Sequence, residues 1–151
     1  MQPWRSSLPF THERIGAAAI YCSDGRYNEQ FDEFLHTRLD LPRYDRLAIP
    51  GGAAALAGHF AAYREEDSLR DQLRFLIVAH ELERIVLIAH QGCGFYIKKL
   101  HISEDHLRPT QEADLRKAAD AIRTLNSQIR IDAFFSSVNS DRVSIEPVPL
   151  D

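Results

Sequence analysis

One stretch of sequence indicates the fold more clearly than any other: Arg84-Ile-Val-Leu-Ile-Ala-His90-Gln-Gly-Cys93-Gly94. Its first half is a short, continuous apolar run, which is typical of a strand buried on both faces of a parallel sheet. The run passes directly into a turn that carries a histidine, a cysteine and two glycines. We therefore expect His90 and Cys93 at the carboxyl end of a central strand, where parallel sheets place their functional loops.

Two further apolar runs end in unusual loops. The run 15–22 (Ile-Gly-Ala-Ala-Ala-Ile-Tyr-Cys) predicts a buried strand that stops at Ser23-Asp24-Gly25-Arg26. The shorter run 46–49 predicts a strand closed by Pro50-Gly51-Gly52. If the strands that end at Cys22 and at His90 are neighbours in the sheet, their ends bring Cys22, His90 and Cys93 together.

The segments between these strands carry apolar residues at helical spacing. They predict helices over 28–39, 53–63, 68–82 with Ser68 as its N-cap, and 110–129. Segments 131–138 and 142–148 flank Asn139-Ser140-Asp141, which predicts a hairpin. This order predicts an α/β domain over 15–151, preceded by an N-terminal arm over 1–14. The expected sheet is mainly parallel, with about four strands, helices on both faces and an antiparallel edge strand from the hairpin.

Composition limits the partners. The formal net charge is −4 and the sequence pI about 6.0, with basic residues interleaved among acidic ones, so no basic face is expected for nucleic acid or an acidic membrane. No apolar run approaches the roughly 20 residues that span a bilayer. The first twelve residues lack the apolar core of a secretory signal. We therefore expect a cytoplasmic protein without nucleic-acid or membrane partners.

The chemistry of the three side chains points to a metal. Two thiolates and one imidazole suit tetrahedral zinc, and three protein ligands leave a fourth position for water, as in catalytic sites. Taken alone, a cysteine at the end of a buried strand is most often a packing residue. A disulfide between the two cysteines would explain neither His90 nor the pair Asp24 and Arg26. Asp24 can accept a hydrogen bond from metal-bound water, and Arg26 can hold Asp24 ionised.

At this point two motifs resemble a known family. Cys22-Ser23-Asp24-Gly25-Arg26 is similar to the Cys-x-Asp-x-Arg signature of β-class carbonic anhydrases, and His90-Gln91-Gly92-Cys93-Gly94 resembles their His-x-x-Cys-Gly. The resemblance implies that Cys22, His90 and Cys93 bind one Zn²⁺ per chain and that Asp24 and Arg26 form a dyad beside the zinc-bound solvent. It also implies reversible hydration of CO2 to bicarbonate by a zinc-bound hydroxide, in a homodimer or larger homo-oligomer.

One segment departs from the family pattern. Where the family generally has an Arg-Asn-Ala-Gly-like segment, this chain has Pro50-Gly51-Gly52-Ala53, without the cationic and amide side chains. This argues against the regulatory bicarbonate pocket that some members build partly from that arginine. Relatives on the same zinc framework hydrolyse carbonyl sulfide or carbon disulfide, which is the alternative activity. The residues expected to line the substrate pocket are Gly51, Gly52, Gly94, Phe95 and Tyr96, although the two aromatic residues fit a core position equally well.

Two hypotheses from other classes remain. The glycines at 51, 52 and 58 precede a predicted helix, as in a nucleotide- or phosphate-binding module, but they match neither Gly-x-Gly-x-x-Gly nor a P-loop. The changed loop also fits a non-catalytic zinc-binding member of the family. A zincin is excluded because His80-Glu81 is followed by Arg84 where that motif requires a second histidine.

Overall fold

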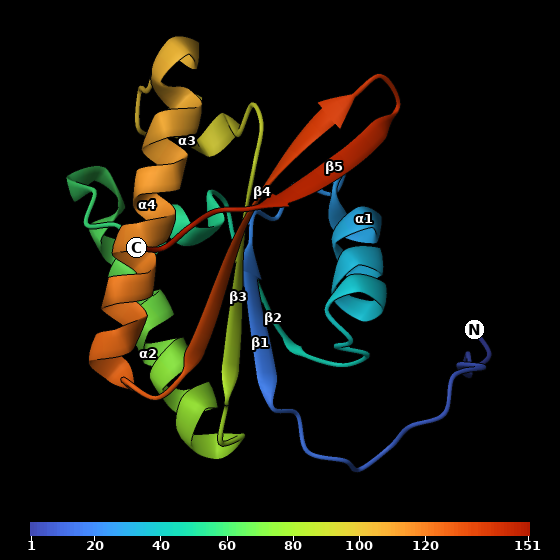
Figure 1. Cartoon of the computed structure of the whole chain (residues 1–151). Helices are drawn as coiled ribbons and strands as arrows, with labels where there is room; N and C mark the ends of the chain where they lie inside the picture. Colours follow the sequence, from blue (N-terminus) through green and yellow to red (C-terminus); the bar gives the residue numbers. More distant parts are fainter.

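Five strands form one sheet in the spatial order β2-β1-β3-β4-β5 in the computed structural model, which describes residues 1–151 (Figure 1). The first four strands run parallel, and the last is antiparallel to its neighbour. This confirms the predicted α/β class with a mainly parallel sheet and an antiparallel edge. The strands are β1 (Ala17–Tyr21), β2 (Asp45–Ala48), β3 (Arg84–His90), β4 (Arg130–Asn139) and β5 (Arg142–Pro147).

The two central strands, β1 and β3, are direct neighbours. Their register pairs Ala17 with Arg84 and Tyr21 with Ile88, so both strands end at the same edge of the sheet. Every residue of β1 is buried, and only the first residue of β3 is partly exposed. The sequence predicted a shared site only if these two strands were neighbours in the sheet. In the structure they are neighbours, and their ends lie side by side.

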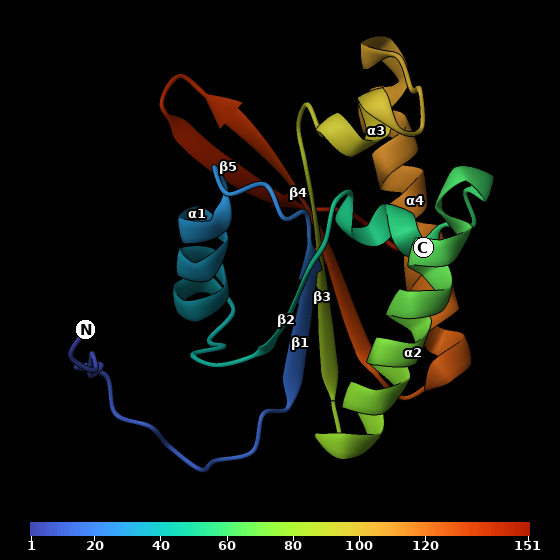
Figure 2. The ribbon, with the colours of Figure 1, turned by 180° about the vertical axis from the view of Figure 1, so that it is seen from behind.

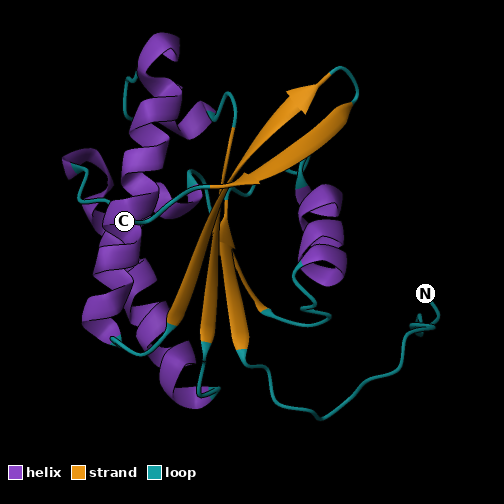
Figure 3. Cartoon of the chain, in the orientation of Figure 1, coloured by secondary structure: helices purple, strands orange, loops and turns teal.

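Helices cover both faces of the sheet, as Figures 1 and 2 show from opposite sides and Figure 3 shows by element type. One face carries α1 (Asn28–Glu33), which continues as the π-helical turn η1 (Phe34–Arg38). The other face carries α2 (Tyr63–Ala79), α4 (Glu104–Leu125) and the 3₁₀ turn η2 (Gly52–Leu56). The 3₁₀ turn η3 (Phe60–Ala62) precedes α2, and α3 (Gly94–Lys98) follows β3.

Alternation along the central strands divides the core into two layers. Ile20 and Leu87 belong to the larger apolar cluster under α2 and α4. Tyr21 and Ile88 point to the opposite side, where they join the smaller cluster that contains Phe31 of α1. Successive side chains of a strand face opposite sides of the sheet, so each strand can support both layers only if nearly all of its residues are apolar.

Two helix predictions on the α2 side are wrong. No continuous helix covers 53–63; the segment forms η2 and η3 instead, separated near Gly58, whose φ of 77° lies outside the helical region. Ser68 is not an N-cap, because α2 already begins at Tyr63. Acidic residues in the first turn of α2 interact favourably with the helix dipole, and the sequence interpretation did not use them as a helix-start signal.

The start of the long C-terminal helix was also predicted wrongly. Helix α4 begins at Glu104 rather than 110, directly after Ser103, and it contains Pro109. The sequence interpretation treated the residues before 110 as a polar connection. Pro109 lies near the helix N-terminus, and its missing N–H removes only one backbone hydrogen bond there. The extra turns place Leu107 beside the carboxyl ends of the central strands, where it is buried.

Residues 1–16 contain no helix or strand and lead away from the foot of β1 (Figure 1). Their large apolar side chains stay exposed, with relative exposures of 85% for Trp4, 79% for Leu8 and 83% for Phe10. None of the helices is both long and apolar enough to cross a lipid bilayer.

Candidate metal centre

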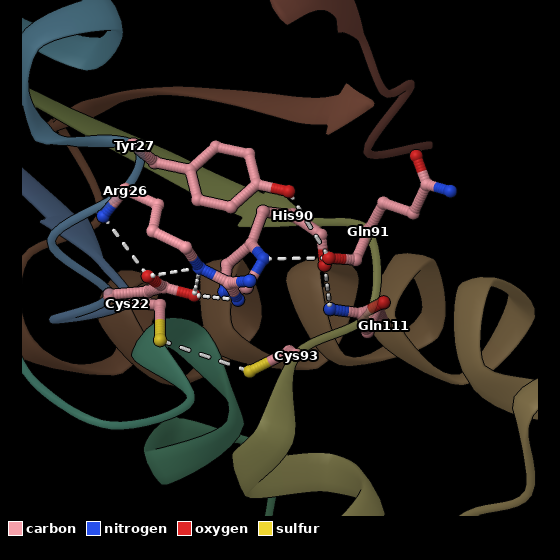
Figure 4. A network of polar contacts seen from close by, with 8 residues as sticks. Cys22, Arg26, Tyr27, His90, Gln91, Cys93 and Gln111 are labelled. Atoms are coloured by element: carbon pink, nitrogen blue, oxygen red, sulfur yellow. Dashed lines mark hydrogen bonds and ion pairs between the residues drawn. The ribbon is translucent and has the colours of Figure 1, made fainter. Parts of the chain in front are cut away.

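Three side chains meet where β1 and β3 end. Cys22 directly follows β1, His90 is the last residue of β3, and Cys93 is the N-cap of α3 (Figure 4). One ligand atom from each residue lies within 4.8 Å of the other two, and all three residues are buried. The structure thus brings together the group that the sequence singled out, in an arrangement that can hold a metal ion.

The geometry of the group fits zinc. The two sulfur atoms lie 3.8 Å apart. Two Zn–S bonds of about 2.3 Å at a tetrahedral angle span about 3.8 Å between the sulfurs, so no rearrangement of the cysteines is needed. Nδ1 of His90 donates to the carbonyl oxygen of Gln91 (2.8 Å), which leaves Nε2 with its lone pair. That Nε2 is buried without a hydrogen-bond partner, which is costly unless a cation occupies the site.

The two sulfurs interact as a pair. The Cys93 thiol donates to the Cys22 sulfur and holds the pKa of Cys22 below its usual range. The same contact, together with burial, raises the pKa of Cys93, while the backbone N–H groups of Tyr96 and Phe95 act in the opposite direction. The contact thus favours a thiolate at Cys22, which is the form of cysteine that binds a metal.

A carboxylate with a fixed orientation follows Cys22. Arg26 binds both oxygens of Asp24, with Nε 3.0 Å from Oδ1 and Nη2 2.6 Å from Oδ2. The backbone N–H of Arg26 also donates to Oδ1 (3.1 Å). These hydrogen bonds from Arg26 lower the pKa of Asp24 to about 2. Asp24 is mostly shielded while Arg26 is exposed. A carboxylate that is ionised at neutral pH thus lies two residues after Cys22.

The two glycines after β2 allow the close approach of neighbouring elements. A Cβ on Gly51 would lie 2.4 Å from Cδ1 of Phe95, and a Cβ on Gly52 would lie 3.0 Å from the backbone nitrogen of Cys22. Both glycines also have positive φ, 79° and 53°. The Pro50-Gly51-Gly52 loop is thus shaped to pack against Cys22 and Phe95. Because the loop leads into a 3₁₀ turn, it offers no long helix N-terminus of the kind that a phosphate-binding module needs.

The two predicted pocket aromatics lie in different surroundings. Phe95 lines a cavity of about 580 Å³ together with Ile49 and Pro50. Tyr96 is only 2% exposed, and its hydroxyl donates to Asp114 (2.8 Å), so this ring packs beneath the cysteines. Gly94 opens α3 with free space around it. Of the predicted pocket residues, the structure therefore brings Phe95 to the wall of a cavity and Tyr96 into the core.

Comparison with known proteins places the chain in a family. A family model described as "Putative carbonic anhydrase" matches residues 12–148. The chain belongs to this family. An uncharacterized protein of Rickettsia conorii is 24% identical over 136 residues, which cover 86% of this chain and 72% of that protein.

Solved carbonic anhydrases share the fold. The enzyme of Streptococcus mutans superposes with a TM-score of 0.57 at 17% identity, covering 97% of this chain and 88% of that one. A β-carbonic anhydrase of Trichomonas vaginalis gives 0.56 at 13% identity, covering 92% and 87%. A β-carbonic anhydrase of Aspergillus fumigatus gives 0.53 at 13% identity, covering 93% and 94%. At these identities the likeness establishes a common fold for this carbonic anhydrase family member.

Sequence reasoning missed two residues that hold His90 in place. The ring of Tyr27 packs on the His90 ring with centroids 4.4 Å apart, and its hydroxyl lies 3.4 Å from the carbonyl oxygen of Gln91. The side-chain amide of Gln111 donates to the carbonyl oxygen of His90 (2.8 Å; Figure 4). Tyr27 directly follows the Cys-x-Asp-x-Arg motif, so its place in the sequence could have marked it as a residue of the site. Gln111 comes from α4, and nothing in the local sequence marks it.

Alanine at Gly52 is expected to destabilise this carbonic anhydrase family member more than alanine at Gly58. Both glycines have positive φ, so each substitution carries a strain of about 1–2 kcal/mol. Only at Gly52 does the new Cβ also meet backbone, at 3.0 Å from Cys22, whereas the space around Gly58 is open. Urea denaturation of both variants measures the difference. Equal losses of unfolding free energy would contradict the close approach of this loop to Cys22.

Proposed function

We propose that the chain is a zinc-dependent carbonic anhydrase that catalyses the reversible hydration of CO2 to bicarbonate. The observation that carries the proposal is the group of two buried sulfurs and the unpartnered Nε2 of His90 at the joined ends of β1 and β3. The Asp24–Arg26 pair beside this group and the membership of the carbonic anhydrase family support the same reaction.

In this proposal Cys22, Cys93 and Nε2 of His90 would hold one zinc ion per chain. Zinc bound there would supply a Lewis acid that makes water nucleophilic near neutral pH. The surrounding side chains position His90. Tyr27 and Gln111 fix the ring and the backbone of His90, so that Nε2 faces the two sulfurs.

Asp24 orients the attacking water. Because Arg26 lowers the pKa of Asp24 to about 2, the carboxylate stays ionised and accepts a hydrogen bond without taking the proton. The hydrogen bond directs the oxygen lone pair of the water toward the carbon of CO2. One proton is released for each bicarbonate formed, and it passes to solvent. Arg26 keeps the carboxylate in one rotamer by binding both of its oxygens.

The cavity beside Phe95 has an apolar side next to the loop 50–53. Ile49, Pro50 and Phe95 line that side, and the loop contributes no charged side chain, whereas Arg64, Glu65 and Lys99 line the rest of the cavity. The apolar side fits an uncharged substrate, and it also fits a second candidate activity, hydrolysis of carbonyl sulfide or carbon disulfide, because these molecules are linear and uncharged like CO2.

The proposal includes a homodimer in a reducing compartment such as the cytoplasm. The exposed apolar side chains Trp4, Leu8 and Phe10 lie on an arm that makes little contact with its own domain, and a second copy of the chain can cover them. A reducing compartment keeps Cys22 and Cys93 as thiols, which a metal requires.

Replacement of His90 tests the metal ligands. Wild-type protein is expected to carry about one zinc per chain, and His90→Ala or Cys93→Ser far less, because two remaining ligands bind weakly. His106→Ala, which removes an exposed histidine outside the site, should keep the full content. Elemental analysis after gel filtration measures the ratio. Wild-type zinc well below one per chain, without chelator, would overturn the proposal.

Replacement of Asp24 tests the reaction. Asp24→Asn should retain zinc and lower kcat/KM for CO2 hydration by about 10²-fold or more, measured by stopped flow, because an uncharged amide oxygen is a weaker acceptor than a carboxylate and the amide can turn its N–H donors toward the water. Asp32→Asn is the matched control, since Asp32 also pairs with an arginine, Arg46, outside the metal centre. Zinc-loaded wild-type protein that hydrolyses carbonyl sulfide but does not hydrate CO2 would establish the second candidate. Activity on neither substrate would leave a non-catalytic zinc protein.

A further inference from the structure

Asp114 of α4 is the only acidic residue of the chain that is buried, with a relative exposure of 0%. A buried carboxylate is costly unless hydrogen bonds compensate for the lost water. Replacing such a group by an apolar residue often leaves stability unchanged or higher, so core stability alone does not explain a carboxylate here. Its hydrogen-bond partners indicate what it does.

Two donors from different elements meet at one oxygen of Asp114. The Tyr96 hydroxyl lies 2.8 Å from Oδ2, and Nε2 of His59 lies 2.6 Å from the same atom. Burial and the charge of Asp114 raise the pKa of Tyr96, so its hydroxyl remains the donor. Tyr96 belongs to α3, and His59 lies between η2 and η3. One carboxylate therefore ties α3 to the η2–η3 segment.

Both tied elements pack on the cysteines of the metal centre. Tyr96 lies three residues after Cys93 and shares a buried cluster with Cys22, Cys93 and Ala54 of η2. Gly52, the first residue of η2, lies against the backbone of Cys22. Both elements thus contact the segments that carry the two sulfurs.

Helix α4 also contacts the backbone of His90, the third residue of the group. Gln111, one turn before Asp114, donates to the carbonyl oxygen of His90. Residues three apart on a helix lie on the same face. A single face of α4 therefore contacts the segment that carries His90 and the segment that carries Cys93.

We propose that Asp114 is a positioning residue for the metal centre: by binding Tyr96 and His59 together, it fixes the Cys93 sulfur relative to Cys22. The inference rests on the proposed zinc site but not on the proposed reaction. It predicts that loss of either hydrogen bond weakens metal binding and changes the ligand geometry, while Cys22, His90 and Cys93 themselves stay intact.

The test compares two tyrosines. Tyr96→Phe removes the hydroxyl that binds Asp114, and Tyr44→Phe removes the hydroxyl of another buried tyrosine, which binds Asp32 on the other side of the sheet. Tyr96→Phe should bind zinc about 10- to 100-fold more weakly in competition with a chelator, as is typical when a group supporting a ligand is lost. It should also shift the thiolate charge-transfer bands of the cobalt-loaded protein. Tyr44→Phe should match wild type in both measurements.

A second pair of variants uses a partly exposed side chain, so that folding is preserved. His59→Ala should weaken zinc binding in the same direction as Tyr96→Phe. His59→Gln should restore binding, because its amide N–H can donate to Asp114 from a similar position. If the variants acted only by lowering the stability of the fold, zinc binding would not be lost in His59→Ala and restored in His59→Gln.

The outcomes separate the two proposals. Equal zinc affinities and equal cobalt spectra for Tyr96→Phe and Tyr44→Phe would overturn the positioning role while leaving the proposed reaction intact. Wild-type protein that shows the predicted Tyr96→Phe effect but no CO2 hydration would overturn only the reaction. Wild-type protein that takes up neither zinc nor cobalt would overturn both.

Discussion

The structure depends on the parallel pairing of β1 with β3. These strands are buried on both sides and end at the same edge of the sheet, which brings Cys22 next to His90 and Cys93 although about 70 residues separate them. A slip of one residue would turn every side chain of a strand to the other face and would separate the sulfurs. The apolar layers above and below the strands therefore maintain the candidate metal centre as well as the fold.

Burying two thiols and an imidazole side by side costs free energy when no cation binds between them. Contacts with neighbouring residues hold the group rigid. The ring and backbone of His90 are held by Tyr27 and Gln111, and the lone pair of Nε2 is left free. Rigid placement lowers the entropy that metal binding would otherwise cost. Near this site Arg26 holds Asp24 ionised and in one orientation.

The sequence predicted the parts of the structure that depend on local pattern. The apolar run before His90 and the motif from Cys22 to Arg26 were enough for the fold class and for the residues that now lie together. The helix predicted over 53–63 was wrong because alanine-rich composition favours a helix, whereas the backbone turns at Gly58, whose φ is positive, and forms two separate 3₁₀ turns. The supporting contacts of Gln111 and Asp114 could not be predicted, because they arise where α4 packs on two distant segments.

X-ray absorption at the zinc edge tests the central claim most directly. The account predicts two sulfur neighbours at about 2.3 Å, one imidazole nitrogen at about 2.0–2.1 Å and one further light atom, which is the signature of a catalytic rather than a structural zinc site. A spectrum without sulfur in the first coordination shell, or with only oxygen and nitrogen neighbours in sixfold geometry, would contradict it.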